Sequence, residues 1–174
     1  MKITRLPVLL LLLLFVQCSK EKNNDPSPDL GKGLLAYLEL NGQFKDSAGN
    51  FDVTSGGFLS WAKNRHGYGN RALSCNGGLF SFAVPWWRAN PITVSLWVKP
   101  NGLDVTGCLL SSHEGTFGMY QQQSKIGFSI CNPDTAFAFA EVAAEWTHVT
   151  GTFDGNDIKT YINGKLMTTL RHPG

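Results

Sequence analysis

From residue 34 onward the chain consists of short segments in which apolar and polar residues alternate, separated by turn residues. From residue 92 to 98, for example, every second residue is Ile, Val or Leu, and Pro-Asn-Gly follows at 100 to 102. Alternation with a period of two places successive side chains on opposite faces of a β-strand. No segment in this region sustains the 3.6-residue apolar period of an amphipathic helix. The chain is therefore predicted to form an all-β domain.

Turn residues near the C-terminus predict an antiparallel meander. Asp154-Gly155-Asn156 and Asn163-Gly164 each separate two alternating runs. Asn-Gly favours the positive φ angles of a type I′ hairpin turn. Strands spaced by about 8 to 12 residues favour a two-sheet sandwich over a parallel α/β fold. We expect strands at residues 35–40, 71–75, 79–84, 92–98, 108–112, 117–121, 125–131, 137–141, 146–153, 158–163 and 166–170.

The N-terminus has the pattern of an export signal. Lys2 and Arg5 precede nine consecutive apolar residues, 8–16, too few to cross a bilayer core about 30 Å thick. Residues 1–17 are therefore predicted to be a signal peptide. The ending Leu-Phe-Val-Gln-Cys resembles a bacterial lipobox, although Gln17 replaces the usual small residue. The resemblance implies lipid attachment at Cys18. The alternative is ordinary cleavage, with Cys18 an incidental thiol.

Residues 18–33 are predicted to be a flexible tether, because they are rich in charged residues, Pro, Ser and Gly. The segment Ser-Lys-Glu-Lys at 19–22 is similar to the signal that sends Bacteroidetes lipoproteins to the cell surface; a solvated spacer is the alternative reading. We therefore expect an outer-membrane lipoprotein at the cell surface, anchored through its lipid, with secretion or a periplasmic location as alternatives. Without Lys2 and Arg5, 13 basic residues balance 13 acidic ones, so no basic field favours nucleic acid.

Five blocks of sequence suggest a family. They are Gly-Leu-Leu-Ala-Tyr-Leu-Glu-Leu-Asn-Gly at 33–42, Gly-Asn-Arg-Ala-Leu-Ser-Cys-Asn-Gly at 69–77, Ile-Thr-Val-Ser-Leu-Trp-Val-Lys-Pro at 92–100, Trp-Thr-His-Val-Thr-Gly-Thr-Phe-Asp-Gly at 146–155 and Tyr-Ile-Asn-Gly-Lys at 161–165. In this order they resemble the concanavalin A-like, laminin G-like jelly-roll domains of bacterial surface proteins. The resemblance implies an antiparallel two-sheet sandwich over residues 34–174, whose concave sheet meets sugars or protein partners.

The resemblance also implies a further strand. Such domains continue beyond the Asn-Gly-Lys hairpin into a closing strand that pairs with the first strand, whereas this sequence stops at Gly174. We therefore expect a domain that is incomplete at its C-terminus and lacks this strand. Otherwise the strand expected at residues 35–40 has an unpaired edge.

The best enzymatic candidates are Glu141 and Glu145, because jelly-roll glucanases place two catalytic carboxylates on one strand with an Asp between them. Retaining glycoside hydrolysis needs carboxyl groups about 5 to 5.5 Å apart, of which one is protonated. Ala143 stands at the middle position and cannot support either carboxylate, and Glu145 is expected in a turn. His148 is expected to make a structural hydrogen bond. We therefore predict that the protein is not an enzyme, and a glycoside hydrolase fragment is the less favoured reading.

A structural calcium ion is implied by the resemblance. Asp46, Asn50 and Asp52 lie within seven residues, and their oxygens suit Ca²⁺, although their spacing is not that of an EF-hand. Asx turns around Gly49 explain the same residues equally well.

A binding function needs aromatic faces with polar neighbours, because sugar C–H groups stack on rings while hydroxyl groups seek hydrogen bonds. Trp86, Trp87, Arg88 and Asn90 have this chemistry in one loop and are the predicted ligand-binding residues, although the two tryptophans could instead cap the core. Trp97 and Trp146 match scaffold positions of the resembled family and are expected to pack. The polar hairpin formed by Tyr120, Gln121, Gln122, Gln123 and Lys125 could line a rim.

Three cysteines lie in the predicted domain. Cys75 is expected to face the core, and Cys108 and Cys131 form either a disulfide bond or two buried free thiols. Taken together, the sequence predicts a non-catalytic, surface-anchored carbohydrate-binding or adhesion module. Its partner would be a glycan or an extracellular protein, and a protein interaction domain without sugar binding is the alternative.

Overall fold

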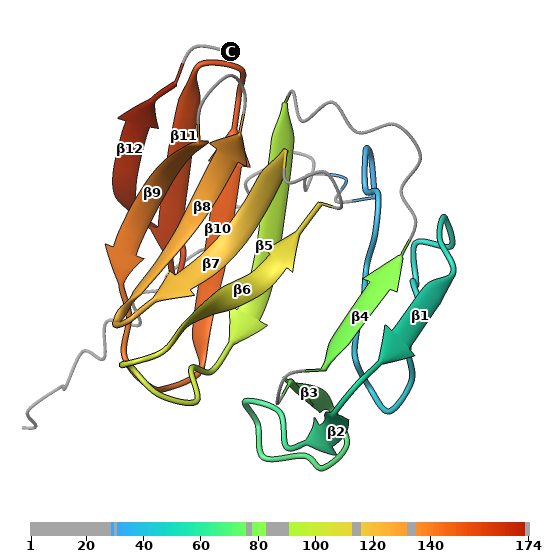
Figure 1. The fold of residues 1–174 in the computed structure, drawn as a ribbon. Helices are drawn as coiled ribbons and strands as arrows, with labels where there is room; N and C mark the ends of the chain where they lie inside the picture. The colour runs from blue at the N-terminus through green and yellow to red at the C-terminus, as the bar shows by residue number, and fades with distance from the viewer. Residues whose placement is uncertain are drawn as a thin grey trace, which may run out of the picture. The chain divides into compact units, whose positions relative to one another are not determined.

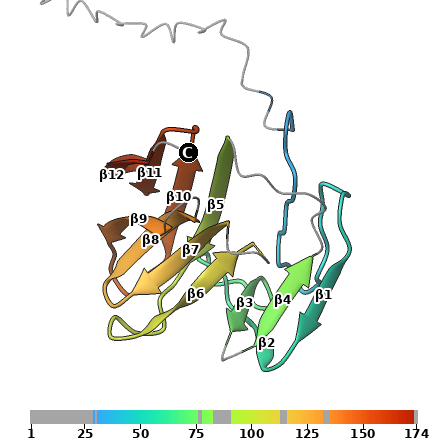
Figure 2. The same ribbon diagram turned by 45° about the horizontal axis from the view of Figure 1, so that its top comes forward.

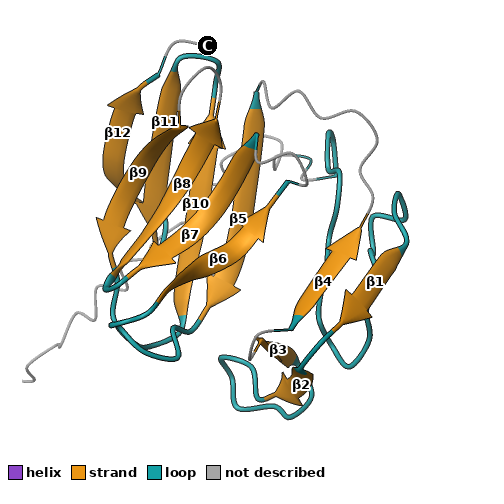
Figure 3. Ribbon diagram, in the orientation of Figure 1, coloured by secondary structure: helices purple, strands orange, loops and turns teal. Residues whose placement is uncertain are grey.

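The structure is a computed structural model that describes residues 29, 31–75, 78–82, 91–112, 116–131 and 135–172. Contacts divide the chain into two compact units, Met1–Leu34 and Leu35–Gly174. The described part of the first unit is a turn, in which the backbone amide of Lys32 donates to the Asp29 carbonyl. The described residues of the second unit form strands and loops, as Figure 3 shows. Within the described ranges, no helix is long and apolar enough to cross a membrane.

Two four-stranded antiparallel sheets dominate the second unit (Figure 1). One sheet has the order β12-β11-β10-β5 and the other β6-β7-β8-β9. The first consists of β5 (Ile92–Val98), β10 (Thr147–Phe153), β11 (Asp157–Ile162) and β12 (Lys165–Arg171). The second consists of β6 (Thr106–Ser111), β7 (Phe117–Gln122), β8 (Lys125–Cys131) and β9 (Thr135–Glu141).

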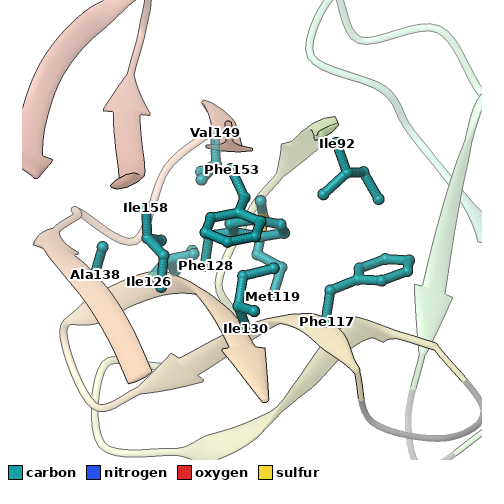
Figure 4. Packing of buried hydrophobic residues seen from close by; sticks show 10 residues of the cluster. All are labelled: Ile92, Phe117, Met119, Ile126, Phe128, Ile130, Ala138, Val149, Phe153 and Ile158. Atoms are coloured by element: carbon teal, nitrogen blue, oxygen red, sulfur yellow. The ribbon is translucent and has the colours of Figure 1, made fainter. Parts of the chain in front are cut away.

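The two sheets face each other as the layers of a sandwich, which Figures 1 and 2 show from two directions. Strand β8 packs against β10 and β11, and β9 packs against β11 and β12. Inward-facing residues of both sheets form one apolar core (Figure 4). Each fully buried Val, Ile, Phe or Met side chain in it stabilises the fold by about 1.5–3 kcal/mol. The core residues are Ile92, Phe117, Met119, Ile126, Phe128, Ile130, Ala138, Val149, Phe153 and Ile158. The prediction of an all-β, two-sheet antiparallel sandwich is confirmed.

The hairpin predicted from Asn163-Gly164 is also confirmed. Ile162 pairs with Lys165 across a two-residue loop, and both loop residues have positive φ angles, 50° for Asn163 and 79° for Gly164. These are the angles that a type I′ turn requires.

The N-terminal part of the second unit differs from the prediction. It forms two small sheets, β1 (Val53–Gly56) with β4 (Leu79–Phe82), and β2 (Leu59–Ala62) with β3 (Ala72–Cys75). Neither β1 nor β2 was expected from the sequence.

The strand expected at residues 35–40 does not form, and that prediction is wrong. This segment has only an isolated bridge between Leu38 and Asp46. The backbone amide of Tyr37 donates to the carboxylate of Asp46, and the Tyr37 carbonyl accepts from the amide of Ser47. These groups therefore hold a loop together instead of a strand ladder.

Candidate functional site

Three aromatic side chains lie on the solvent-facing side of the β6-β7-β8-β9 sheet. In β7 the residues Phe117, Met119 and Gln121 are buried, so Tyr120 points the other way. In β9 the buried residues Ala138 and Ala140 alternate with outward-facing aromatic rings. We call the outward-facing set Tyr120, Phe137 and Phe139 the aromatic platform.

The rings of the platform contact one another. The centroids of Phe137 and Phe139 are 5.3 Å apart with planes inclined by 8°, so these rings are stacked. The centroids of Tyr120 and Phe137 are 5.6 Å apart with planes inclined by 76°, an edge-to-face arrangement. Both arrangements are favoured by the quadrupoles of aromatic rings. The platform is therefore a continuous apolar surface, and the side chain of Phe137 is 38% exposed.

Two glycines let the rings lie against the sheet. A Cβ atom at Gly127 would lie 2.5 Å from the ring of Phe139, and a Cβ atom at Gly118 would lie 2.4 Å from the ring of Tyr120. Real Cβ atoms do not approach other atoms this closely. The absence of side chains at these positions therefore makes room for the two rings.

Polar groups surround the platform. Burial raises the pKa of the Tyr120 hydroxyl, coulombic repulsion from the nearby Cys108 and Cys131 side chains raises it further, and a hydrogen bond with Ser111 offsets part of the effect. The hydroxyl therefore stays protonated at neutral pH and can both donate and accept a hydrogen bond. At one end of the sheet, Lys125 Nζ lies 3.6 Å from a carboxylate oxygen of Glu141.

The two enzymatic candidates, Glu141 and Glu145, lie in different kinds of structure. Glu141 is at the end of β9 and pairs with Lys125, whereas Glu145 is exposed in the turn before β10. A retaining mechanism requires two facing carboxyl groups, one of them kept protonated by its surroundings. Glu141 is the last residue of β9 and Glu145 lies outside the strand, so the two carboxylates do not lie together on one strand as in the glucanase pattern.

The outer face of the other sheet carries a second group of polar and aromatic residues. His148 Nε2 is 2.8 Å from Ser95 Oγ, so the structural hydrogen bond expected for His148 is confirmed. Trp97 was expected to pack as scaffold, but it faces outward and is 43% exposed. Apolar residues occupy the opposite face of β5, which leaves Trp97 on the solvent side.

Asp46, Asn50 and Asp52, the predicted calcium ligands, lie in one loop, where the carboxylate of Asp46 already has backbone partners. Asp46 is buried, and one of its carboxylate oxygens accepts hydrogen bonds from the backbone amides of Tyr37 and Ala48. The other oxygen accepts from the amides of Asn50 and Phe51. A carboxylate has about four lone-pair sites, and these four amides use them all.

The neighbouring residues support the same description of this loop. The side-chain amide of Asn50 donates to the carbonyl of Leu35, and Asp52 is exposed. A hollow of about 540 Å³ beside them is lined by residues 44–46 and 49–53, which belong to this loop and the start of β1. In the described ranges, no group of three or more His, Cys, Asp or Glu residues is placed to hold a metal ion. The donor geometry therefore does not fit Asp46 as a calcium ligand, and calcium binding remains a prediction.

Several predicted residues lie outside the described ranges. They are Cys18, the predicted lipid attachment site, and Trp86, Trp87, Arg88 and Asn90, the predicted ligand-binding residues.

Two sets of sequence expectations need correction. Gln121 does not line a rim, because it is buried and its side-chain amide donates to the carbonyls of Gly102 and Gln123. Cys75 and Cys108 are exposed free thiols rather than buried ones, and Cys131 is a half-buried free thiol. The disulfide alternative for Cys108 and Cys131 is therefore not what the structure contains.

The sequence did not single out the platform as a site, although a signal was present. Residues 136–140 read Ala-Phe-Ala-Phe-Ala, so one face of the strand carries only methyl groups and the other carries two rings. Which face is buried depends on the sheet packed against it, and alternation alone does not give that.

Comparisons with known proteins agree with this architecture. The model of a family described as Laminin_G_3, of the concanavalin A-like lectin/glucanases superfamily, matches residues 76–174. Among solved structures, the chain is similar to domain 4 of AbnA, a GH43 extracellular arabinanase from Geobacillus stearothermophilus, in complex with arabinotriose. That likeness has a TM-score of 0.58 and 20% sequence identity, and it covers 83% of this chain and 73% of that chain. The search of curated proteins gave no match.

Proposed function

The chain belongs to the concanavalin A-like lectin/glucanase superfamily, and we propose that it is a non-catalytic carbohydrate-binding module whose aromatic platform holds a glycan. The observation that carries this proposal is the platform itself: Tyr120, Phe137 and Phe139 form a continuous aromatic surface open to solvent. Sugar C–H groups stack on such rings because the ring faces are electron-rich.

The groups around the rings suit the polar side of a sugar. The Tyr120 hydroxyl and the exposed side chain of Gln122 lie on the same face of β7. Both can exchange hydrogen bonds with sugar hydroxyl groups, which fixes the orientation of a ligand held mainly by apolar contact. The charges of Lys125 and Glu141 neutralise each other, so this face favours an uncharged sugar.

The similar arabinanase domain supports the class of ligand, because its structure contains arabinotriose. Fold likeness does not itself assign a ligand. We also propose that the loop containing Trp86, Trp87, Arg88 and Asn90 adds contacts to the glycan, and that a lipid at Cys18 anchors the module to the outer membrane. The tether at residues 18–33 would then let the domain reach glycans beyond the membrane surface.

Binding to soluble neutral polysaccharides tests the proposal. Affinity electrophoresis and titration calorimetry would use arabinan, arabinoxylan and mixed-linkage β-glucan as probes. Phe137→Ala removes the central ring and should weaken binding by about tenfold, the effect of losing about 1.4 kcal/mol of stacking energy. The matched control is Leu103→Ala, because Leu103 is also 38% exposed but is not part of the platform. The control should bind as the unchanged protein does.

Three results would contradict the proposal. Equal affinities for the Phe137→Ala and Leu103→Ala variants would exclude the platform. Loss of binding only in a double variant with Trp86→Ala and Trp87→Ala would assign the site to that loop alone. Absence of binding to all three polysaccharides by the unchanged protein would favour an interaction domain for proteins. Unfolding curves of each variant would show that the domain remains folded.

A further inference from the structure

A cationic and aromatic surface lies on the outer face of β5 and β10, in the sheet that does not carry the platform. The guanidinium carbon of Arg65 lies 4.4 Å from the centroid of the Trp97 ring, a cation–π arrangement. The ring centroids of Trp97 and His148 are 5.1 Å apart. We call the set Arg65, Ser95, Trp97, His148 and Thr150 the Trp97 surface.

Cross-strand pairing fixes the parts of this surface relative to one another. His148 is opposite Trp97 in the register of β5 and β10, and Thr150 is opposite Ser95. The Ser95 hydroxyl lies 2.8 Å from His148 Nε2 and 3.1 Å from the Thr150 hydroxyl. The His148 backbone amide also donates to the side-chain oxygen of Asn163. The polar groups therefore occupy defined positions, and a ligand would not need to order them.

The charge of the surface is positive. The segment 61–71, which contains Arg65, carries Lys63, Arg65 and Arg71 and no acidic residue. Lys99 follows Trp97 by two residues, on the same side of the chain. With the residues that the structure describes, Arg65 forms no ion pair. Asp154 directly follows β10, but its carboxylate lies 3.4 Å from Lys159 Nζ, so a lysine of the same sheet partners it. Glu145 precedes β10 by two residues.

We propose that the Trp97 surface is a second binding site, which takes the carboxylate of an acidic saccharide such as a uronic acid residue. A guanidinium group that stacks on an indole keeps the N–H groups along its edge available, and their fork matches a carboxylate. The Trp97 ring holds this fork in place. The hydroxyl and imidazole groups of Ser95, His148 and Thr150 then lie beside the bound anion, where the hydroxyl groups of a sugar ring need partners.

The chemistry favours an acidic sugar over other anions. The chain without its signal has no excess of basic residues, which argues against nucleic acid. The surface is part of a sheet face that carries hydroxyl groups, which suit the hydroxyl groups of a sugar better than the apolar side chains of a peptide. Charge complementarity and the row of hydroxyl groups therefore select a saccharide that carries carboxylates.

This site is independent of the aromatic platform, because the two surfaces belong to different sheets. The inference does not require that the platform binds a neutral glycan. One protein could therefore hold a neutral and an acidic chain of the same polysaccharide network.

The test compares probes that differ in one charged group. Titration calorimetry of the full chain would use polygalacturonate, the same polymer after methyl esterification, and arabinan. We expect Arg65→Gln to weaken polygalacturonate binding by about tenfold, and Arg65→Lys to weaken it by about three- to fivefold, because Lys keeps the charge but not the fork. The matched control is Arg171→Gln, which removes an exposed arginine from the β12 edge of the same sheet and should change affinity by less than about twofold.

Further arms separate the alternatives. Methyl esterification should weaken binding as much as Arg65→Gln does, and Arg65→Gln should leave any arabinan binding unchanged. Binding of polygalacturonate without binding of arabinan would leave this inference standing while the platform proposal fails. Equal loss in the Arg65→Gln and Arg171→Gln variants, or equal binding of the esterified polymer, would overturn the inference. Binding of dextran sulfate or of polyglutamate as tight as that of polygalacturonate would overturn the inference too, because the site would then recognise negative charge alone.

Discussion

The replacement of Asp46 by Ala should destabilise the loop at residues 37–51, and this prediction also decides between a carboxylate that caps a loop and one that binds calcium. The structure gives Asp46 four backbone partners, at distances from 2.7 to 3.2 Å. The side chain is 3% exposed, so water in the folded protein does not compete for these partners. The variant would leave four amides without their acceptor.

The expected cost follows from these contacts. Removing a capping side chain that serves one or two amides costs about 0.5–2 kcal/mol. Four amides double the number of lost bonds, which gives about 1–4 kcal/mol, but water enters the emptied site and replaces part of them, so we expect a loss of about 1–3 kcal/mol. Asp46→Asn keeps one acceptor oxygen and turns an NH₂ group toward the other two amides. This variant should therefore lose at least half as much.

Urea unfolding and amide hydrogen exchange measure this loss. With an m-value of about 2 kcal/mol/M, Asp46→Ala should lower the midpoint by about 0.5–1.5 M. If the loop opens without the rest of the domain, the amides of Tyr37, Ala48, Asn50 and Phe51 should instead exchange faster by about tenfold per 1.4 kcal/mol. Asp154→Ala is the control. Asp154 accepts from the amides of Asn156 and Asp157, but it is exposed, and its loss should matter less.

The dependence on pH gives a second test. Burial raises the pKa of the Asp46 carboxyl, but the hydrogen bonds from four backbone amides together outweigh it and lower the pKa below its ordinary value. A lowered pKa in the folded state gives stability that is present above the unfolded pKa of about 3.9 and is lost as the pH falls through the folded value. The difference between Asp46→Ala and the unchanged protein should therefore be full at pH 7 and shrink below about pH 4.

Calcium would produce a different pattern. If Asp46 caps the loop, removal of calcium with EDTA should leave the unfolding curve of the unchanged protein where it was. If EDTA moves that curve to the position of the Asp46→Ala curve, and added calcium restores it, then Asp46 is an ion ligand and the loop-cap reasoning is refuted.

Two further predictions concern the core and the anchor. Gly151→Ala should lower the free energy of unfolding, measured in urea, by about 1–3 kcal/mol, because a Cβ atom there would lie 2.2 Å from the Phe128 ring. The control is Gly107→Ala, which should be nearly neutral because a Cβ atom there meets nothing within 4 Å. Equal effects of the two substitutions would refute this account of the core. Cys18→Ser should move the protein from the membrane fraction to the soluble fraction and abolish labelling by a radioactive fatty acid, whereas retention in the membrane fraction would contradict lipid anchoring at Cys18.

The features that the sequence predicted are those that depend on neighbouring residues. The hairpin at Asn163-Gly164 depends on the φ angles of two adjacent residues, and those angles follow from their side chains. The strand at residues 125–131 has the predicted bounds. The orientation of Trp97 also follows from the sequence, because Trp97 alternates with the apolar residues of β5 and therefore shares a face with Ser95. The resemblance assigned Trp97 a scaffold role but did not give its exposure, which is 43%.

The features that the sequence did not predict depend on distant partners. The segment 35–40 alternates as a strand would, but a strand exists only where another strand pairs with it. Asp46 takes the amide of Tyr37 instead, and nothing near residue 37 indicates this bond. The sequence does not predict the role of Asp46 either, because its spacing from Asn50 and Asp52 suits a calcium site and an Asx loop equally. Only the positions of the four backbone amides around its carboxylate distinguish a loop cap from a calcium ligand.

The platform shows how one alternating segment can serve both the core and a surface. Hydrophobicity alone would bury Phe137 and Phe139 and expose their alanine neighbours, yet the structure buries Ala138 and Ala140. The threonine hydroxyls of the facing strands explain this choice. Thr160 Oγ1 in β11 donates to the carbonyl of Ala138 over 2.6 Å, and Thr168 Oγ1 in β12 donates to the carbonyl of Phe139 over 2.6 Å.

Side chains from one sheet reach the backbone of the other at such distances only where the intervening side chains are small. Methyl groups on the inner face of β9 permit this close approach, and a phenyl ring there would separate β9 from β11 and β12. Because the side-chain period of a strand is two, placing alanines inside places the rings of Phe137 and Phe139 outside. The contacts that close the sandwich at β9 thus also fix the aromatic surface that we propose binds a glycan.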